Sequence, residues 1–208
     1  MKIGFVGAGH IGTALAGHFA RLDHDLVLSN SRGPETLAQL VEQLGPNATA
    51  GTTEEAIAFG EIVVVTIPLK AVRSLPAEAF AGKTVIDTCN YYPERDGQFP
   101  ELDNGSTTES EVVAAHLEGA DVVKAFNSIY FVHLAEQGKP SGDPERRAIP
   151  IASDSGAAKQ LVAQLIDQIG FEPVDAGELS AGRKFENGAA LYGAELTGPA
   201  LAEALANA

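Results

Sequence analysis

Three glycines near the start of the chain have the spacing of a phosphate-binding turn. Gly7, Gly9 and Gly12 form the pattern G-x-G-x-x-G between an apolar segment at residues 2–6 and a stretch with helical periodicity. In this context the first glycine makes the tight turn, the second lets the backbone approach a pyrophosphate, and the third allows helix and strand to pack closely. Free N–H groups at the start of the helix would hold the negative charge. The pattern therefore predicts a dinucleotide site, with His10 at its border.

The residues that end the second expected strand distinguish between the two nicotinamide dinucleotides. Enzymes that bind NAD usually place Asp or Glu there, about 20 residues beyond the glycines, to hold the ribose 2′-hydroxyl. This chain has Asn30, Ser31 and Arg32 instead, and no carboxylate in the segment 29–33. Arg32 can pair with a 2′-phosphate in a charge-assisted fork, and the other two side chains can donate hydrogen bonds. We expect NADP(H) rather than NAD(H), the alternative being that Arg32 is a solvated loop residue.

Further candidate residues follow three later strands of the expected sheet. In open α/β sheets, ligands bind outside the carboxyl ends of the strands, near the point where the strand order reverses. We expect the first of these segments to pass beneath the riboses, with Leu69 and Val72 as walls. Asn127 is the candidate for orienting a nicotinamide or a substrate, and its alternative role is that of a turn-forming asparagine. The candidate residues are Thr66, Ile67 and Pro68, then Asn90, and last Ala125 and Asn127.

The histidines and the single cysteine do not form a second reactive arrangement. His18 lies on the apolar stripe of the first helix and is predicted to pack in the core, and Cys89 is predicted to be a buried or cleft-lining thiol. No His, Asp or Cys has the spacing of metal ligands, and no nucleophile stands beside a base. Direct hydride transfer requires neither, because the cofactor supplies the chemistry.

The composition is that of a globular chain with strong acidic character. Of its 208 residues 45% are hydrophobic, which is enough for a substantial core, and the formal net charge is −14. That charge opposes nonspecific attraction to nucleic acid or anionic membranes. No apolar stretch approaches the ~18 residues of a membrane span, and the N-terminus runs directly into strand-like sequence. We expect a cytoplasmic protein whose partner is a small molecule.

Strand patterns alternate with helical patterns along the whole chain. This alternation predicts an α/β fold, namely a Rossmann-type, doubly wound and mostly parallel sheet with helices on both faces. We expect one NADP-binding domain at residues 1–184 and a short helical C-terminal extension at 185–208. The predicted strands span residues 2–6, 25–29, 49–51, 61–67, 84–87, 121–126, 148–152 and 172–175.

Two segments carry the chemistry of helix caps. Thr52 with Glu55, and Ser106 with Glu109, have the spacing of capping boxes that begin helices. Between residues 88 and 105 only turn signals occur, and no element is predicted. Loops of this length inside compact domains are usually functional or disordered.

Four segments together resemble the NADP-dependent oxidoreductases that use the deazaflavin coenzyme F420. They are the glycine turn, Asn30-Ser31-Arg32, Thr66-Ile67-Pro68 and Lys124-Ala125-Phe126-Asn127. The reductase domain of the STEAP metalloreductases belongs to the same wider group, and the similarity covers most of the chain. The resemblance implies a nicotinamide beside Asn127 and a homodimer to whose interface the C-terminal helices contribute. It also implies a pyrophosphate site at Gly7, Gly9, His10, Ile11 and Gly12, and a 2′-phosphate site at Asn30, Ser31 and Arg32.

Electrostatics constrain the second substrate that this resemblance implies. Coenzyme F420 carries a phosphate and an oligoglutamate tail, so its pocket should offer positive charge. Tyr91 and Tyr92 are expected to stack on a flat ring, although the same loop holds four acidic residues, Glu94, Asp96, Glu101 and Asp103, that would repel an anion. The residues expected to supply positive charge, unless they are ordinary solvated side chains, are Lys139, Arg146, Arg147, Arg183 and Lys184.

Three functions are compatible with the sequence. The favoured one is hydride transfer between NADPH and a deazaflavin or flavin-type acceptor, with coenzyme F420 ahead of a flavin or a ferric chelate. The second is reduction of a small carbonyl or imine, which would need a proton donor near Asn127, such as Tyr130, Lys124 or His133. The third is a module that senses NADPH without turnover. The short segment after Phe185 favours the first, because carbonyl and imine reductases often enclose their substrate with a long helical C-terminal domain.

Overall fold

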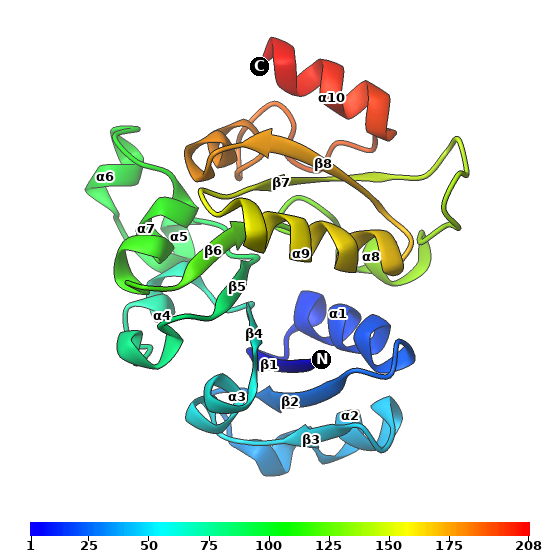
Figure 1. The fold of residues 1–208 in the computed structure, drawn as a ribbon. Helices are drawn as coiled ribbons and strands as arrows, with labels where there is room; N and C mark the ends of the chain where they lie inside the picture. The colour runs from blue at the N-terminus through cyan, green and yellow to red at the C-terminus, as the bar shows by residue number, and fades with distance from the viewer.

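Short runs of apolar and β-branched residues form the strands of one central sheet (Figure 1). A computed structural model describes all residues, 1–208. The strand order is β3-β2-β1-β4-β5-β6-β7-β8; neighbours up to β6 are parallel, and β7 runs antiparallel to β6. The predicted doubly wound, mostly parallel sheet is confirmed. The strands are β1 (Lys2–Val6), β2 (Asp25–Ser29), β3 (Ala48–Ala50), β4 (Ile62–Val65), β5 (Thr84–Asp87), β6 (Asp121–Lys124), β7 (Ala148–Ala152) and β8 (Glu172–Gly177).

Helices cover both faces of the sheet, and strand β4 shows why. Ile62 and Val64 pack into one hydrophobic cluster, whereas Val63 and Val65 pack into another on the opposite face. A strand buried on both sides has no polar face, which explains the unbroken β-branched run in the sequence. The helices are α1 (His10–Arg21), α2 (Ala38–Leu44), α3 (Thr53–Phe59), α4 (Leu69–Val72), α5 (Pro93–Asp96), α6 (Pro100–Asp103), α7 (Glu109–His116), α8 (Phe131–Glu136), α9 (Gly156–Gln168) and α10 (Gly198–Asn207), with 3₁₀ turns at Pro34–Leu37, Ala77–Phe80 and Leu179–Lys184.

The segment between residues 88 and 105 is more ordered than the sequence analysis predicted. It contains two single-turn helices, α5 and α6, and each begins with a proline at its first position. Proline favours that position because its fixed φ suits the first turn and its missing N–H would be unpaired there anyway. A helix of four residues shows no hydrophobic periodicity, so in the sequence only its turn signals are visible.

Of the two predicted capping boxes, one is confirmed and one is wrong. Thr52 and Glu55 cap α3 as predicted. Helix α7 is capped by Thr108 and Glu111 rather than by Ser106 and Glu109. The reason is that the Glu109 side chain is buried and forms an ion pair with Lys124 at the end of β6, so it is not free to fold back on the cap.

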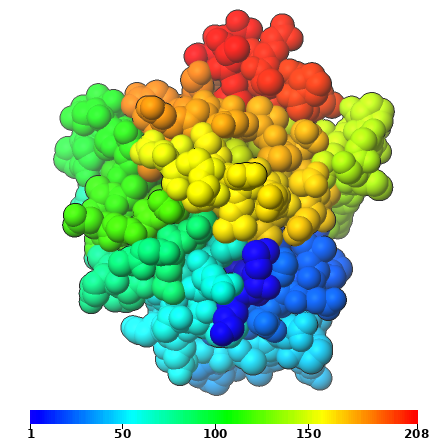
Figure 2. All heavy atoms as spheres, viewed as in Figure 1, coloured from blue at the N-terminus to red at the C-terminus, as the bar shows by residue number.

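The sequence predicts a helical C-terminal extension from residue 185, but the structure does not show a helix there. Residues 185–197 form turns and irregular backbone, and α10 begins only at Gly198. Positive φ angles at Gly188 and Gly193 explain why the backbone cannot continue as a helix there. Leu201 and Leu205 of α10 pack against the β7–β8 side of the sheet, and Figure 2 shows this helix as a ridge at one end of the molecule. None of the helices combines the length and the apolar character that crossing a membrane requires.

Candidate functional site

The glycine turn between β1 and α1 has the geometry that its sequence predicts. Gly7 has a φ of +106°, and a side chain there would lie 2.4 Å from the Thr66 carbonyl oxygen. A Cβ atom at Gly12 would lie 2.6 Å from the Gly7 carbonyl oxygen, whereas one at Gly9 would meet nothing within 4 Å. The outer two glycines therefore allow the chain to pack, and the middle one leaves an open backbone surface at the start of α1.

Two cavities flank this turn, and Gly9, Thr66, Ile67 and Pro68 line both. The first, the Asn127 cavity, has a volume of about 540 Å³. The second, the Arg32 cavity, has a volume of about 470 Å³ and is also lined by Gly7, Asn30, Ser31 and Arg32. Their shared wall means that one extended ligand can cross the turn from one cavity to the other. The remaining walls of the Asn127 cavity come from His10, Ile11, Thr88, Cys89, Asn90, Tyr92, Arg95, Asn127, Ser128, Ile129, Tyr130, Phe131, Tyr192 and Gly193.

The Arg32 cavity offers donors and no carboxylate. The Asn30 Oδ1 atom accepts a hydrogen bond from the Arg32 N–H at 2.9 Å, and Asn30 Nδ2 donates to Thr36 Oγ1 at 2.9 Å. These bonds fix the turn after β2. The Arg32 side chain forms no ion pair within the chain, and Arg32 is the sole charged residue that lines this cavity. Its guanidinium is free to bind an anion.

Asn127 lines the other cavity and directly follows a residue with strained backbone. Phe126, directly before it, has a φ of +62°, a conformation that costs an L-residue about 1–3 kcal/mol. The Asn127 Nδ2 group donates to the Phe185 carbonyl oxygen at 2.9 Å and to Asn90 Oδ1 at 3.3 Å. Both partners are acceptors, so the amide orientation is fixed. Its Oδ1 atom is then buried without a hydrogen-bond partner, so Asn127, which lines the cavity, retains an acceptor that the chain itself does not use.

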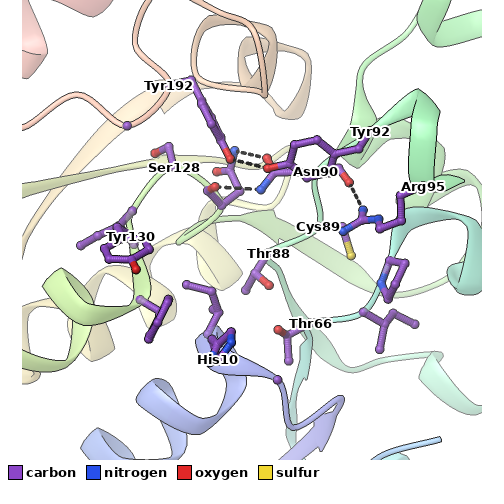
Figure 3. A pocket seen from close by; sticks show the side chains of 18 residues that line it. His10, Thr66, Thr88, Cys89, Asn90, Tyr92, Arg95, Ser128, Tyr130 and Tyr192 are labelled. Atoms are coloured by element: carbon purple, nitrogen blue, oxygen red, sulfur yellow. Dashed lines mark hydrogen bonds between the residues drawn. The ribbon is translucent and has the colours of Figure 1, made fainter.

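Aromatic rings form two walls of the Asn127 cavity (Figure 3). On one side His10 stacks on Phe131, with ring centroids 4.2 Å apart and planes inclined by 17°, and Tyr130 packs against Phe131. On the other side the Tyr92 and Tyr192 hydroxyls form a hydrogen bond of 2.7 Å. This bond ties the loop after β5 to the C-terminal segment. A cavity with these walls suits a planar aromatic ligand.

A cluster of buried charges lies beside the cavity and was not predicted from the sequence. The Lys124 ammonium donates to Glu109 Oε2 at 3.0 Å, and Lys124 is fully buried. Asp87 accepts a hydrogen bond from the Ser110 hydroxyl, and the Glu109 backbone N–H donates to Glu186 Oε1 at 2.7 Å. Three carboxylates thus surround one lysine at the carboxyl ends of β5 and β6.

The excess of carboxylates determines how the cluster is protonated. Burial lowers the pKa of Lys124, but Asp87 and Glu109 outweigh it and hold that pKa above its usual value, so the ammonium stays charged. Burial raises the pKa of Glu109, against the attraction of Lys124. Burial also raises the pKa of Glu186, to about 7, again opposed by Lys124. Glu186 is therefore the member of the cluster that gains or loses a proton near neutral pH.

Several predicted wall residues lie elsewhere in the structure. Leu69 and Val72 are buried in the core, and the exposed side of the same segment, at Ala71 and Ser74, lines the Arg32 cavity instead. Ala125 is buried in the core and lines neither cavity. The four-residue helix α4 and the end of β6 carry no periodic signal that would have given the side-chain directions. The predictions that His18 packs in the core and that Cys89 is a buried, cleft-lining thiol are confirmed.

None of the five residues that were expected to supply positive charge, unless they are ordinary solvated side chains, lines the Asn127 cavity. Arg95, which the sequence analysis did not select, lines it instead. The predicted stacking residue Tyr92 also lines it, whereas the Tyr91 hydroxyl donates to Asp103 at 2.8 Å, away from the cavity. Lys139, Arg146 and Arg147 pair with acidic side chains, Lys184 donates to the Leu205 carbonyl oxygen, and Arg183 is exposed.

Comparison with known proteins agrees with this geometry. Residues 2–91, which include the glycine turn, the Arg32 segment and Thr66–Pro68, match the family described as NADP oxidoreductase, coenzyme F420-dependent. Residues 2–91 of the chain are thus similar in sequence to the F420-dependent NADP oxidoreductases. The resemblance predicted from the sequence is confirmed, and the match supports an NADP-dependent oxidoreductase role in general terms.

Similarity to individual proteins extends over most of the chain. The human metalloreductase STEAP2 is 28% identical over 190 residues, which are 90% of this chain but 35% of that protein, so the chain spans about a third of its length. The structure of the hypothetical protein SMa0349 from Sinorhizobium meliloti superposes with a TM-score of 0.80 and 28% identity over 95% of both chains. A protein from Arthrobacter sp. FB24, described as a candidate F420-dependent NADP reductase, superposes with a TM-score of 0.74 and 24% identity over 88% of this chain and 87% of its own. The last likeness shows the fold.

The open surface at Gly9 makes a prediction about dinucleotide binding. Gly9→Val should leave the fold intact, because a Cβ atom there meets nothing within 4 Å, but should abolish binding of NADPH and NADH alike. Binding is measured by fluorescence titration, with the thermal unfolding midpoint as the control for folding. Normal binding by the folded variant would mean that the pyrophosphate lies elsewhere.

The raised pKa of Glu186 predicts how stability depends on pH. Its folded-state pKa of about 7 exceeds the usual glutamate value of 4.5, so its contribution to stability is fully present below pH 4.5 and is lost as the pH rises through about 7. Glu186→Gln keeps the acceptor for the Glu109 N–H and removes the titration. The variant should therefore unfold roughly 2–4 °C above the wild type at about pH 8, with a smaller difference at about pH 5.

The matched control for that prediction is Glu203→Gln, a change at an exposed glutamate on α10. It should leave the unfolding midpoint unchanged at both pH values. An equal difference between Glu186→Gln and the wild type at both pH values would contradict the assignment of the raised pKa.

Proposed function

We propose that the protein transfers hydride between NADPH and a deazaflavin or flavin-type acceptor, with coenzyme F420 favoured. The observation that carries the proposal is the Asn127 cavity, in which an unpartnered amide acceptor and two aromatic walls adjoin the glycine turn. When bound, the dinucleotide supplies the hydride, and the acceptor takes up the hydride together with one proton from solvent or a side chain.

The residues present fit NADP(H) at three places. The open backbone at Gly9 and the start of α1 would hold the pyrophosphate, with His10 and Ile11 beside it. The free guanidinium of Arg32, with Asn30 and Ser31, would bind the 2′-phosphate. The buried Oδ1 of Asn127 would accept a hydrogen bond from the carboxamide of the nicotinamide.

The aromatic walls of the Asn127 cavity support a flat acceptor. Hydride transfer between two rings requires that they lie face to face, and binding in one cavity supplies that orientation. The His10–Phe131 stack and the Tyr92–Tyr192 pair leave a space between aromatic surfaces, beyond the segment Thr66–Pro68. The homodimer and the cytoplasmic location implied above remain predictions.

Reduction of a small carbonyl or imine is a second candidate, favoured by a different observation. That reaction needs a proton donor, and the Tyr92–Tyr192 hydroxyl pair lines the cavity. Of the donors predicted from the sequence, Tyr130 also lines the cavity. Lys124 is buried in its ion pair with Glu109, and His133 contacts Arg147 and Glu195 instead.

The turnover assay distinguishes these reactions. Oxidation of NADPH by the purified protein is followed with coenzyme F420, FMN and a ferric chelate in parallel, and with a cyclic imine as the fourth acceptor. We expect rapid turnover with the deazaflavin. Turnover with the imine alone would establish the second candidate, and tight NADPH binding without any turnover would establish a sensor.

The choice of dinucleotide is tested at Arg32. Arg32→Ala should raise the Michaelis constant for NADPH about tenfold or more, because a hydrogen bond to a charged group contributes roughly 1.5–3 kcal/mol. The constant for NADH, which lacks the 2′-phosphate, should not change. An unchanged constant for NADPH would refute the 2′-phosphate assignment.

A further inference from the structure

Arg95 is the sole permanently charged residue among those that line the Asn127 cavity. The chain as a whole has 28 acidic and 14 basic residues, so a charged side chain drawn at random would more often be acidic. Arg95 also lies outside the Arg32 cavity, whose charged residue is Arg32. The Asn127 cavity therefore has a cation of its own, separate from the expected 2′-phosphate site.

The Arg95 guanidinium is held rigidly along one edge. Its Nε and Nη2 atoms donate to the two carboxylate oxygens of Asp96 at 3.0 and 2.8 Å, and Nη2 also donates to the Asn90 carbonyl oxygen at 2.6 Å. Its plane lies over the Tyr92 ring, with the central carbon 4.8 Å from the ring centroid. The Asp96 side chain is fully buried, which keeps the pair in place.

The opposite edge of the guanidinium is free. The Nη1 group forms no hydrogen bond or ion pair within the chain. An arginine whose orientation is fixed by a carboxylate and an aromatic ring loses little entropy when it binds a second anion. Phosphate and carboxylate groups accept such N–H donors with two oxygens at once.

The nearby acidic side chains leave the Nη1 group of Arg95 without an acceptor. Asp96 accepts hydrogen bonds from Arg95 and from the Tyr92 backbone N–H. Glu101 pairs with Arg73, and Asp103 accepts from the Tyr91 hydroxyl. None of these carboxylates lines the Asn127 cavity.

We infer that Arg95 is a specificity-determining residue that binds an anionic group, a phosphate or a carboxylate, on the hydride acceptor. The inference rests on the proposed function, because it places the acceptor in the Asn127 cavity. It adds that acceptors bearing such a group are selected over neutral ones with the same ring. Arg95 then contributes to binding of the acceptor rather than to the hydride step.

The test uses two flavins that share one ring system and differ by a phosphate. Riboflavin and FMN are titrated into the NADP⁺-saturated protein, and their dissociation constants are measured from the quenching of flavin fluorescence. The wild type should bind FMN about tenfold or more tightly than riboflavin, as a charge-assisted hydrogen bond implies. Arg95→Gln should abolish that preference and leave the affinity for NADPH unchanged.

Two further variants keep the test decisive. Arg183→Gln removes an exposed arginine that lines neither cavity, and it should retain the preference for FMN. Because Arg95→Gln leaves Asp96 buried without its partner, the double variant Arg95→Gln/Asp96→Asn removes both charges together, and its thermal unfolding midpoint reports on folding.

The outcomes separate the inference from the proposed function. Equal binding of both flavins by the wild type, binding of neither, or retention of the preference in a folded Arg95 variant would overturn the inference. Parallel loss of NADPH affinity would also overturn it, because Arg95 would then bind the dinucleotide. A phosphate preference without NADPH oxidation would instead refute the proposed reaction and leave the anion site in place.

Discussion

The geometry of the site depends on the buried ion pair between Lys124 and Glu109. The Lys124 ammonium lies at the end of β6 and contacts Glu109 at the start of α7 and the Cys89 carbonyl oxygen after β5. Glu109 in turn accepts from the Tyr91 N–H and, through its own N–H, holds Glu186 of the C-terminal segment. Loss of one partner of a buried ion pair costs about 3–5 kcal/mol, because the other charge is left uncompensated. The cluster thus connects segments that are far apart in the sequence.

Residues next to that cluster in the sequence position the walls of the Asn127 cavity. Phe185, which precedes Glu186, accepts the hydrogen bond that fixes the Asn127 amide, and Tyr92, which follows Tyr91, bonds to Tyr192. The irregular segment 185–197 therefore lines part of the cavity, through Tyr192 and Gly193, without contributing a helix or strand. Glu186, whose pKa burial raises to about 7, directly follows the residue that positions Asn127, so a proton gained or lost there changes the charge beside the cavity.

The sequence predicts what local patterns encode. The glycine spacing predicts the turn, the β-branched runs predict the buried strands, and the absent carboxylate after β2 predicts the open guanidinium of Arg32. Contacts between distant residues escape it. The Glu109 spacing resembles a cap, but its carboxylate is recruited by Lys124, and the position of Tyr192 depends on a hydrogen bond across 100 residues. The sequence also does not predict the directions of side chains in single-turn helices such as α4 and α5, because four residues are too few to show a hydrophobic period.

The distribution of charge places an arginine in each of the two cavities of a strongly acidic chain. Each of the two cavities has one permanently charged lining residue, and in both it is an arginine. The net charge of −14 acts from outside, where ions screen exposed charges beyond about 8–10 Å. Inside the two cavities, the hydrogen-bond donors of Arg32 and Arg95 act on a ligand at short range. A phosphorylated dinucleotide would bring further negative charge into the two cavities. An anionic acceptor could then bind beside it only if the Asn127 cavity held a cation that the dinucleotide does not use. The guanidinium of Arg95, which Asp96 and Asn90 hold through Nε and Nη2 and whose Nη1 group has no partner, meets that requirement.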